Sequence, residues 1–205
     1  MKRLIFILLF GFYYVAGSAQ QTQIQLKTDY GSENKDIQEL MRFQGVEKIA
    51  LNFEGEDLIG KDYAFIIKEF TNGRLAKTDT LVASSKSDYI SKIEKNRFKV
   101  DVMVATRLDH SVKFYAKFDR FSINKLYDVE KPKDAYALHD FLGAKQSLEV
   151  KSNTPTYILG YFLPYVDKDT GWKMYCEVSG SKHHPDDWGK AFDIPNYFLV
   201  EVQFY

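Results

Sequence analysis

Residues 97–119 read RFKVDVMVATRLDHSVKFYAKFD, and this stretch decides the fold. Apolar side chains occupy every second position on both sides of a short polar segment: Phe98, Val100, Val102 and Val104 before it, and Val112, Phe114, Ala116 and Phe118 after it. A period of two is typical of a β-strand with one face on a core and the other in water. Because residues 108–111 have the length of a hairpin loop, the stretch predicts two neighbouring antiparallel strands.

A second strand pair is indicated around the dipeptide Asn72-Gly73. Residues 62–71 and 74–82 are both strand-like. An Asn-Gly pair between two such segments favours a two-residue turn, because both residues tolerate positive φ. The sequence therefore predicts a β-hairpin with its turn at Asn72-Gly73.

The remaining segments predict further strands and a few short helices. Helical spacing occurs in residues 34–44, which Gly45 terminates, and in residues 185–192, which begin with a proline. A helical turn is also expected at residues 135–138. Residues 157–163 are apolar on both faces, as in a central strand, and residues 198–204 alternate as a final strand. The pattern further predicts a short strand at 148–150, a strand at 172–178 that buries Cys176, and a loose polar lead-in over residues 20–31.

These elements define the predicted fold class. Antiparallel strands without a βαβ rhythm are typical of mainly β domains. The aromatic content of 16% suits pleated, half-buried surfaces. We therefore expect a mainly β, antiparallel two-layer sandwich-like domain with one N-terminal helix and short peripheral helices. Residues 20–205 are enough chain for a single domain with a sizeable core.

Residues 1–19 have the pattern of an export signal. Lys2 and Arg3 precede the apolar residues 4–15, and Ala16-Gly17-Ser18-Ala19 offers small residues for cleavage. The apolar segment is about a dozen residues long, whereas a membrane-spanning helix needs roughly 20. We therefore expect cleavage after Ala19, an exported protein in the periplasm or outside the cell, and no membrane insertion.

Charge and cysteine content narrow the possible partners. The chain has 28 basic and 28 acidic residues, so there is no electrostatic reason to expect nucleic acid as a partner. Cys176 is the single cysteine, and it cannot form a disulfide within the chain. The fold must therefore be stabilised by its core.

Several stretches resemble a family of secreted domains. They are Gln20-Gln21 after the signal, EGEDLIGKDY at residues 54–63, Trp188-Gly189-Lys190, and IPNYF at residues 194–198. Together with a body rich in Lys, Asn, Tyr and Phe, they look like the small secreted domains of unknown function common in Bacteroides-type gut bacteria. The resemblance spans most of residues 20–205. It implies a Gram-negative bacterium and a single domain, and it supplies no assigned site residues.

Residues 183–188, HHPDDW, concentrate potential metal ligands. Zinc needs three or four converging ligands, but adjacent histidines in an extended segment point in opposite directions and form no i, i+4 pair. The alternative is a loop before a short helix whose first turn holds Asp186 and Asp187, where carboxylates are favoured. Residues 167–171 favour a hairpin turn over a calcium loop, since they lack the later acidic ligands. We expect no metal site and no cofactor.

The sequence indicates no catalytic site. A thiol nucleophile would need Cys176 in contact with a base, for which His139, His183 and His184 are the candidates. Cys176 shares its predicted strand face with apolar residues, which favours an inert core position. Carboxylate pairs for glycoside hydrolysis are available in any soluble domain, and here they would come from Glu54, Glu56, Asp57 or Asp119.

A binding role needs less from the sequence. Aromatic side chains gather in the loop-rich last third, at Tyr165, Trp172, Tyr175 and Trp188. For Trp172 and Trp188, packing in the core is the alternative. We expect an exported non-catalytic binding or accessory domain for a glycan, peptide or protein ligand, with its site at Tyr165, Tyr175, His183, His184 and Trp188. An exported hydrolase of glycan or peptide, or a subunit of a cell-surface assembly, is the alternative function.

Overall fold

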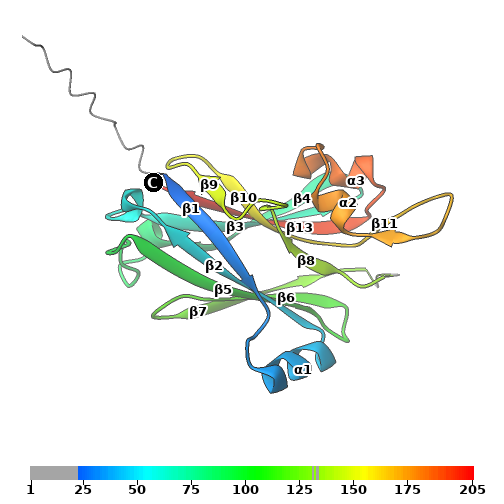
Figure 1. Cartoon of the computed structure of the whole chain (residues 1–205), viewed down its shortest axis with the longest axis horizontal. Coiled ribbons are helices and arrows are strands. Elements are labelled where there is room, and N and C mark those ends of the chain that lie inside the picture. The colour runs from blue at the N-terminus through cyan, green and yellow to red at the C-terminus, as the bar shows by residue number, and fades with distance from the viewer. Residues whose placement is uncertain (1–22, 131, 133) are drawn as a thin grey trace, which may run out of the picture.

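The computed structural model describes residues 23–130, 132 and 134–205. The predicted signal peptide, residues 1–19, lies outside this part of the chain. Two antiparallel β-sheets pack against each other as the layers of a sandwich (Figure 1). The prediction of a mainly β, sandwich-like fold with short peripheral helices is confirmed. Among the described residues, no helix is both long and apolar enough to cross a membrane.

The first sheet has the strand order β7-β6-β5-β2-β1-β9, and neighbouring strands are antiparallel. Its strands are β1 Ile24–Tyr30, β2 Val46–Glu54, β5 Arg97–Thr106, β6 Ser111–Lys117, β7 Ser122–Asp128 and β9 Leu148–Val150. The second sheet has the order β4-β3-β13-β10-β8 and is also antiparallel. Its strands are β3 Tyr63–Thr71, β4 Arg74–Ala83, β8 Ala137–Asp140, β10 Thr156–Phe162 and β13 Asn196–Phe204.

Short helices and a small hairpin complete the described chain. The helices are α1 Lys35–Phe43, α2 Cys176–Ser179 and α3 Trp188–Ala191, with the 3₁₀ turns η1 Glu56–Leu58, η2 Ser84–Lys86 and η3 Pro185–Asp187. Strands β11 Tyr165–Val166 and β12 Lys173–Met174 form the hairpin, which projects from the body of the sandwich in Figure 1. The helices predicted for residues 34–44 and 185–192 are thus confirmed.

The core lies between the two sheets and is rich in aromatic rings. Phe53 of β2 meets Phe204 of β13 edge to face, with 5.1 Å between the ring centroids. Phe114 of β6 meets Phe198 of β13 in the same way at 5.5 Å. All four rings are at most 1% exposed. The sheets are therefore held together by interleaved aromatic side chains from facing strands.

The strands predicted from residues 97–119 form β5 and β6, with Val102 opposite Ala116. The inward-facing valines of β5 are almost fully buried, as the alternation predicts. The apolar segment 157–163 contains β10, which lies between β13 and β8. Its central position is also confirmed, and it explains why both faces of the segment are apolar.

The predicted hairpin at Asn72-Gly73 joins β3 and β4, and Thr71 pairs with Arg74 across the turn. The φ angle is 50° at Asn72 and 69° at Gly73, as a type I′ turn requires. The tip of this hairpin lies against α3. A Cβ atom placed on Gly73 would come within 2.8 Å of Lys190 Cγ, so the turn needs glycine for both its conformation and its packing.

We expect Gly73→Val to lower the free energy of unfolding by about 1–3 kcal/mol, because a β-branched residue is strained at positive φ. Gly143→Val is the matched control. Gly143 has a φ of 60° but nothing within 4 Å of a Cβ atom, so it tests the strain without the crowding. Urea denaturation of both variants should show the larger loss at Gly73. A Gly73→Val variant as stable as the parent would contradict this account of the turn.

The predicted strand at residues 172–178 is wrong. Lys173 and Met174 pair with β11, and Cys176 begins helix α2. Trp172 is 71% exposed and Cys176 is also exposed, so neither lies in the core. The apolar residues Met174 and Val178 are four apart, a spacing that suits a helix as well as alternation suits a strand. In the described chain, the β11–β12 hairpin has no third strand to extend its pairing.

Two further expectations are also wrong. Residues 20–31 were expected as a loose lead-in, but Ile24–Tyr30 form β1, whose Ile24 and Leu26 are buried and whose backbone pairs with both β2 and β9. Residues 135–138, expected as a helical turn, lead into β8, which pairs with β10. In both segments backbone pairing with neighbouring strands outweighs the weak local pattern.

Candidate functional site

The candidate site lies at a corner of the first sheet, where β1 stops before it reaches the first residues of β2. β1 ends at Tyr30, which pairs with Ile49, whereas β2 begins earlier along its own path, at Val46. Residues 46–48 pair with β5 on one side. On the other side the chain leaves β1 for helix α1, after Gly31 N–H donates to Lys48 O at 2.9 Å. The start of β2 therefore has an edge without a β1 neighbour.

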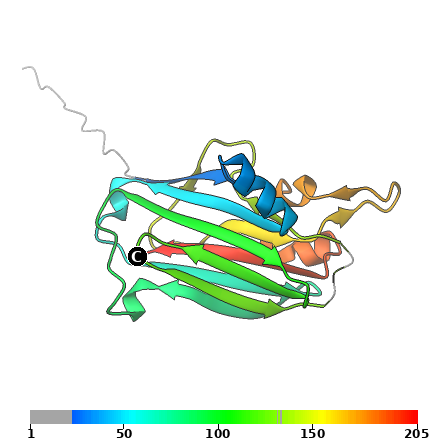
Figure 2. The same ribbon diagram turned by 90° about the horizontal axis from the view of Figure 1, so that it is seen from below.

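A cleft of about 820 Å³ occupies this corner. It lies between α1, the start of β2, strand β8 and residues 134–136, and Figures 1 and 2 show α1 projecting from the sandwich at the end of β1. Small-molecule sites typically measure about 300–1,000 Å³ and combine apolar walls with a few polar groups. This cleft fits that description, since its lining includes Met41, Ile49, Tyr136, Leu138, Tyr161 and Glu47.

Glu47 is the carboxylate on the floor of the cleft. Alternation along β2 puts it on the same inward face as Ile49 and Leu51, which are both fully buried. Its Oε2 atom accepts a hydrogen bond from Leu138 N–H of β8 at 3.0 Å. Burial raises the pKa of Glu47 above its ordinary value, although this hydrogen bond opposes the shift. Within the described residues, Glu47 forms no salt bridge.

Three tyrosine hydroxyls lie near enough to Glu47 to interact with its charge. Glu47 interacts electrostatically with the hydroxyls of Tyr30, Tyr161 and Tyr175. Burial raises the pKa of both Tyr30 and Tyr161 to about 12. The charge of Asp140 adds to the shift at Tyr30, and the charge of Glu47 makes a smaller contribution at both tyrosines. The Tyr161 hydroxyl lies 2.9 Å from Thr106 Oγ1. Tyr30 Oη accepts from Asp140 N–H at 3.1 Å. These hydroxyls are therefore neutral at any physiological pH.

Two sets of local hydrogen bonds order the start of α1 and the segment that leads into it. Asn34 Oδ1 caps the helix by accepting from the N–H groups of Asp36 and Ile37 at 3.0 and 3.1 Å. Gln38 Oε1 accepts from Ser32 N–H at 2.8 Å, so the side chain folds back over the β1–α1 junction. These bonds define the conformation of the segment that forms one side of the cleft, which includes Ser32 and Gln38.

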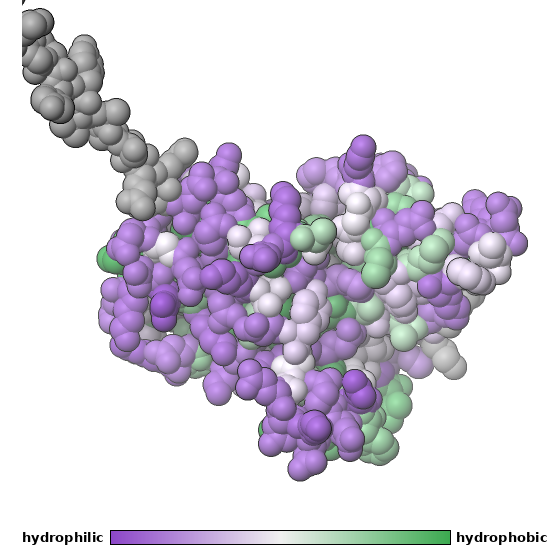
Figure 3. Space-filling model, viewed as in Figure 1, coloured by the Kyte–Doolittle hydropathy of each residue, from purple (hydrophilic) through white to green (hydrophobic). Residues whose placement is uncertain are grey.

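The rest of α1 is largely exposed. Met41 is its buried residue and faces the cleft. Apolar side chains on its outer side, visible as green atoms beside α1 in Figure 3, are exposed by 50% at Ile37, 59% at Leu40 and 84% at Phe43. Arg42 also lines the cleft, and it forms no ion pair within the described residues. The rim thus combines a free guanidinium group with apolar surface.

A second cavity, also of about 820 Å³, has a different lining. It is bordered mainly by charged side chains, and these pair with acidic partners: Lys27 with Glu54 and Lys92 with Asp62, each at 3.1 Å. Such mutually paired surface charges are typical of a solvated face rather than of a ligand site. The cleft at Glu47 is therefore the stronger candidate.

No protein-family model matches the chain. Searches of curated proteins and of solved structures also found no match.

Of the residues predicted for the ligand site, Tyr175 lies next to the cleft. Its hydroxyl donates to Ala135 O at 2.7 Å, and Ala135 lines the cleft. Its ring stacks on His139 with 6.1 Å between centroids. Burial raises the pKa of Tyr175, and the nearby Asp134 and Glu47 charges add to this shift.

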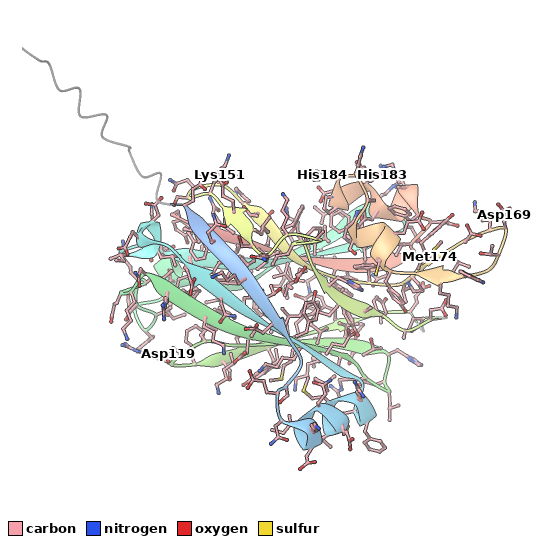
Figure 4. All side chains as sticks on the ribbon, in the orientation of Figure 1. Asp119, Lys151, Asp169, Met174, His183 and His184 are labelled. Atoms are coloured by element: carbon pink, nitrogen blue, oxygen red, sulfur yellow. The ribbon has the colours of Figure 1, made fainter. Side chains whose placement is uncertain are left out.

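Tyr165, His183 and His184 lie elsewhere. Tyr165 and His183 both contact the ring of Phe192, at 5.6 and 5.5 Å between centroids. His184 contacts Tyr157 at 6.0 Å, and its Nδ1 accepts from the N–H two residues on at 3.4 Å. Figure 4 places both histidines at the edge of the molecule away from α1, and Met174 and Asp169 on the projecting hairpin. The structure does not bring these three residues to the cleft.

Trp188 is a core residue. It is 1% exposed, stacks on Phe141 at 5.4 Å and meets Phe162 at 5.0 Å between centroids. It lies over Gly160, where a Cβ atom would come within 3.2 Å of the indole. Trp188 therefore packs in the core and is not part of an exposed ligand site, whereas Trp172 is exposed.

A polar network lies beside His184 on the second sheet. Lys68 Nζ of β3 donates to Glu201 Oε2 of β13 at 2.8 Å and to Tyr157 Oη of β10 at 2.9 Å. Tyr157 Oη in turn donates to Asp186 Oδ1 at 2.6 Å. The Glu201 side chain is only 9% exposed. Because each group in the chain of bonds has a partner, the network joins three strands to η3 and leaves no free group for a ligand.

The residues that line the cleft form no recognisable sequence motif. No group of three or more His, Cys, Asp or Glu suited to a metal ion occurs among the described residues. The signal for Glu47 is instead a charged residue at an inward position, found by extending the alternation of Ile49, Leu51 and Phe53 back towards Val46. Nothing local in the sequence indicates that Arg42, Tyr136 and Tyr161 meet around it.

Proposed function

We propose that the protein is an exported, non-catalytic binding protein whose ligand occupies the cleft at Glu47. The observation that carries this proposal is an inward-facing carboxylate on the floor of a cleft of about 820 Å³ with mainly apolar walls. In ligand sites, apolar walls supply affinity and a few polar groups set the orientation. Glu47 and the neighbouring tyrosine hydroxyls are such polar groups.

The neighbouring groups support binding rather than hydrolysis. Glycoside hydrolysis needs two carboxyl groups that act as acid and as base or nucleophile. Asp140 of β8 does not line the cleft and is engaged in structural bonds: it accepts from the Thr28 hydroxyl and, at 3.0 Å, from Leu142 N–H. Asp134 is engaged in a salt bridge with Lys173. Of the two described carboxylates that line the cleft, Glu47 is therefore the one without a salt bridge.

The compartment is part of the proposal. It is supported by the cationic start, the apolar segment and the small residues of 1–19, which have the pattern of a cleaved export signal. An exported binding protein meets ligands in the periplasm or outside the cell. The size of the cleft favours a small molecule, or the end of a glycan or peptide, over a broad protein surface.

Blocking the cleft tests the binding function. Ala135 is exposed and lines the cleft, so Ala135→Trp should fill it. Ala144 is equally exposed but does not line it, so Ala144→Trp is the matched control. In ligand-observed NMR with a library of small apolar fragments bearing one polar group, we expect hits that bind the parent and Ala144→Trp but not Ala135→Trp. Hits that bind all three proteins alike, or an absence of hits, would argue against the cleft as the site.

A further inference from the structure

We propose that the ligand of this cleft carries a primary amine on an apolar body and that Glu47 binds the amine. This inference rests on the proposed binding function and specifies its ligand class.

The first step is the unmatched charge of Glu47. Its Oε2 accepts one backbone N–H, and no lysine or arginine pairs with it within the described chain. Asp134 at the same corner has Lys173 as its cation. A half-buried carboxylate is stabilised by a cation that enters from the cleft, because burial penalises the unpaired charge. A ligand that brings a cation therefore gains from Glu47, whereas an anion is repelled.

Second, several hydrogen-bond acceptors line the cleft together with Glu47. An ammonium group has three donors that can be aimed independently. The carboxylate of Glu47 and the hydroxyls of Tyr30 and Tyr161 line the same cleft from three different strands, β2, β1 and β10, and each of these oxygens can accept a hydrogen bond. A compact point charge suits this arrangement better than a planar guanidinium, which needs a fork-shaped partner.

The third step is the remainder of the cleft. Its walls include Met41, Ile49 and Leu138, which favour an apolar ligand body. Arg42 on the rim has no partner among the described residues, and it disfavours a second cation at the outer end of the ligand. The expected class is therefore a monoamine with a hydrophobic substituent.

Three probes of nearly the same shape test this class: 2-phenylethylamine, 2-phenylethanol and 3-phenylpropionate. Their dissociation constants are measured by ¹H–¹⁵N NMR titration, with the Leu138 amide as reporter because it donates to Glu47 Oε2. We expect the amine to bind about tenfold more tightly than the alcohol, the gain typical of a hydrogen bond to a charged group. Glu47→Gln should remove this preference while keeping an acceptor for Leu138 N–H. Arg42→Gln is the control on the rim and should leave the preference in place or increase it.

The pH dependence gives a second readout. Glu47 accepts from Leu138 N–H of β8 and interacts with the hydroxyls of Tyr30, Tyr161 and Tyr175, which stay neutral. The other charged or titratable residues that line the cleft are Arg42, Asp134, Tyr136 and Lys48, which pairs with Asp101. Because burial raises the pKa of Glu47, the amine should lose affinity as the pH falls through a range above that of an ordinary glutamate. In Glu47→Gln this loss of affinity with falling pH should disappear, which assigns it to Glu47 and not to Asp134.

The outcomes separate the inference from the proposed function. Equal binding of amine and alcohol in the cleft, or tighter binding of the carboxylate probe, would overturn the amine and leave the binding site standing. If none of the three probes shifts the Leu138 amide or other cleft signals, both proposals fail. A preference for the amine that survives in Glu47→Gln would also overturn the role of Glu47.

Discussion

Replacing Trp188 by alanine is expected to lower the free energy of unfolding by about 3–5 kcal/mol. The indole is 1% exposed and fills the space between Phe141, Phe162 and the backbone at Gly160. Its removal leaves a cavity that these rigid neighbours cannot fill by small shifts. Urea denaturation followed by circular dichroism measures the loss without relying on the deleted fluorophore.

The other tryptophan is the matched control. Trp172 is 71% exposed, so Trp172→Ala should change the stability by no more than about 0.5 kcal/mol. The pair also tests the misassigned segment, because a strand at 172–178 would put Trp172 in the core. Comparable losses in the two variants would contradict the placement of both residues.

Lys68→Met is expected to lower the free energy of unfolding by about 3 kcal/mol. Lys68 is the cationic partner of Glu201, at 2.8 Å, and the Glu201 side chain is only 9% exposed. Removing the ammonium leaves a buried carboxylate without its cation and takes one donor from Tyr157. Denaturation at neutral pH measures this loss.

Two further variants show whether the loss comes from the unpaired charge. In Lys68→Met/Glu201→Leu both partners are apolar, so most of the stability should return. Lys27→Met breaks a salt bridge of similar length, 3.1 Å, whose side chains are 56% and 42% exposed, and it should cost less than about 1 kcal/mol. If the double variant is no more stable than Lys68→Met, the network stabilises the sheet through its shape and not through its charge pairing.

The parts of the fold that follow from the sequence are those with strong local patterns. Strands β5 and β6 alternate over many residues, and Asn72-Gly73 leaves the backbone few choices, so both hairpins are predictable. The lead-in shows the opposite case. β1 contributes few apolar residues, and its pairing with β2 and β9, which are distant in the sequence, decides its conformation.

The candidate site was predictable only in part. Tyr175 was expected in a ligand site and lies beside the cleft, through its bond to Ala135 O. Glu47, Arg42 and Tyr161 come from β2, α1 and β10, and no local motif connects them. They meet because the last residue of β1 pairs with Ile49, so that residues 46–48 at the start of β2 have no β1 neighbour. This arrangement depends on the register of the sheet. A charged residue at an inward position is the one local sign of this corner.

The connection from β1 to β2, which contains α1 and forms one side of the cleft, can be replaced by other segments. Tyr30 and Ile49 pair at its two ends, and changing the length of a flexible connection twofold costs only about 0.6 kcal/mol. Segments of other lengths and compositions can therefore be grafted between residues 31 and 45 to reshape the recognition surface while the two sheets stay intact. The same sandwich can in this way serve as a scaffold for clefts of different selectivity.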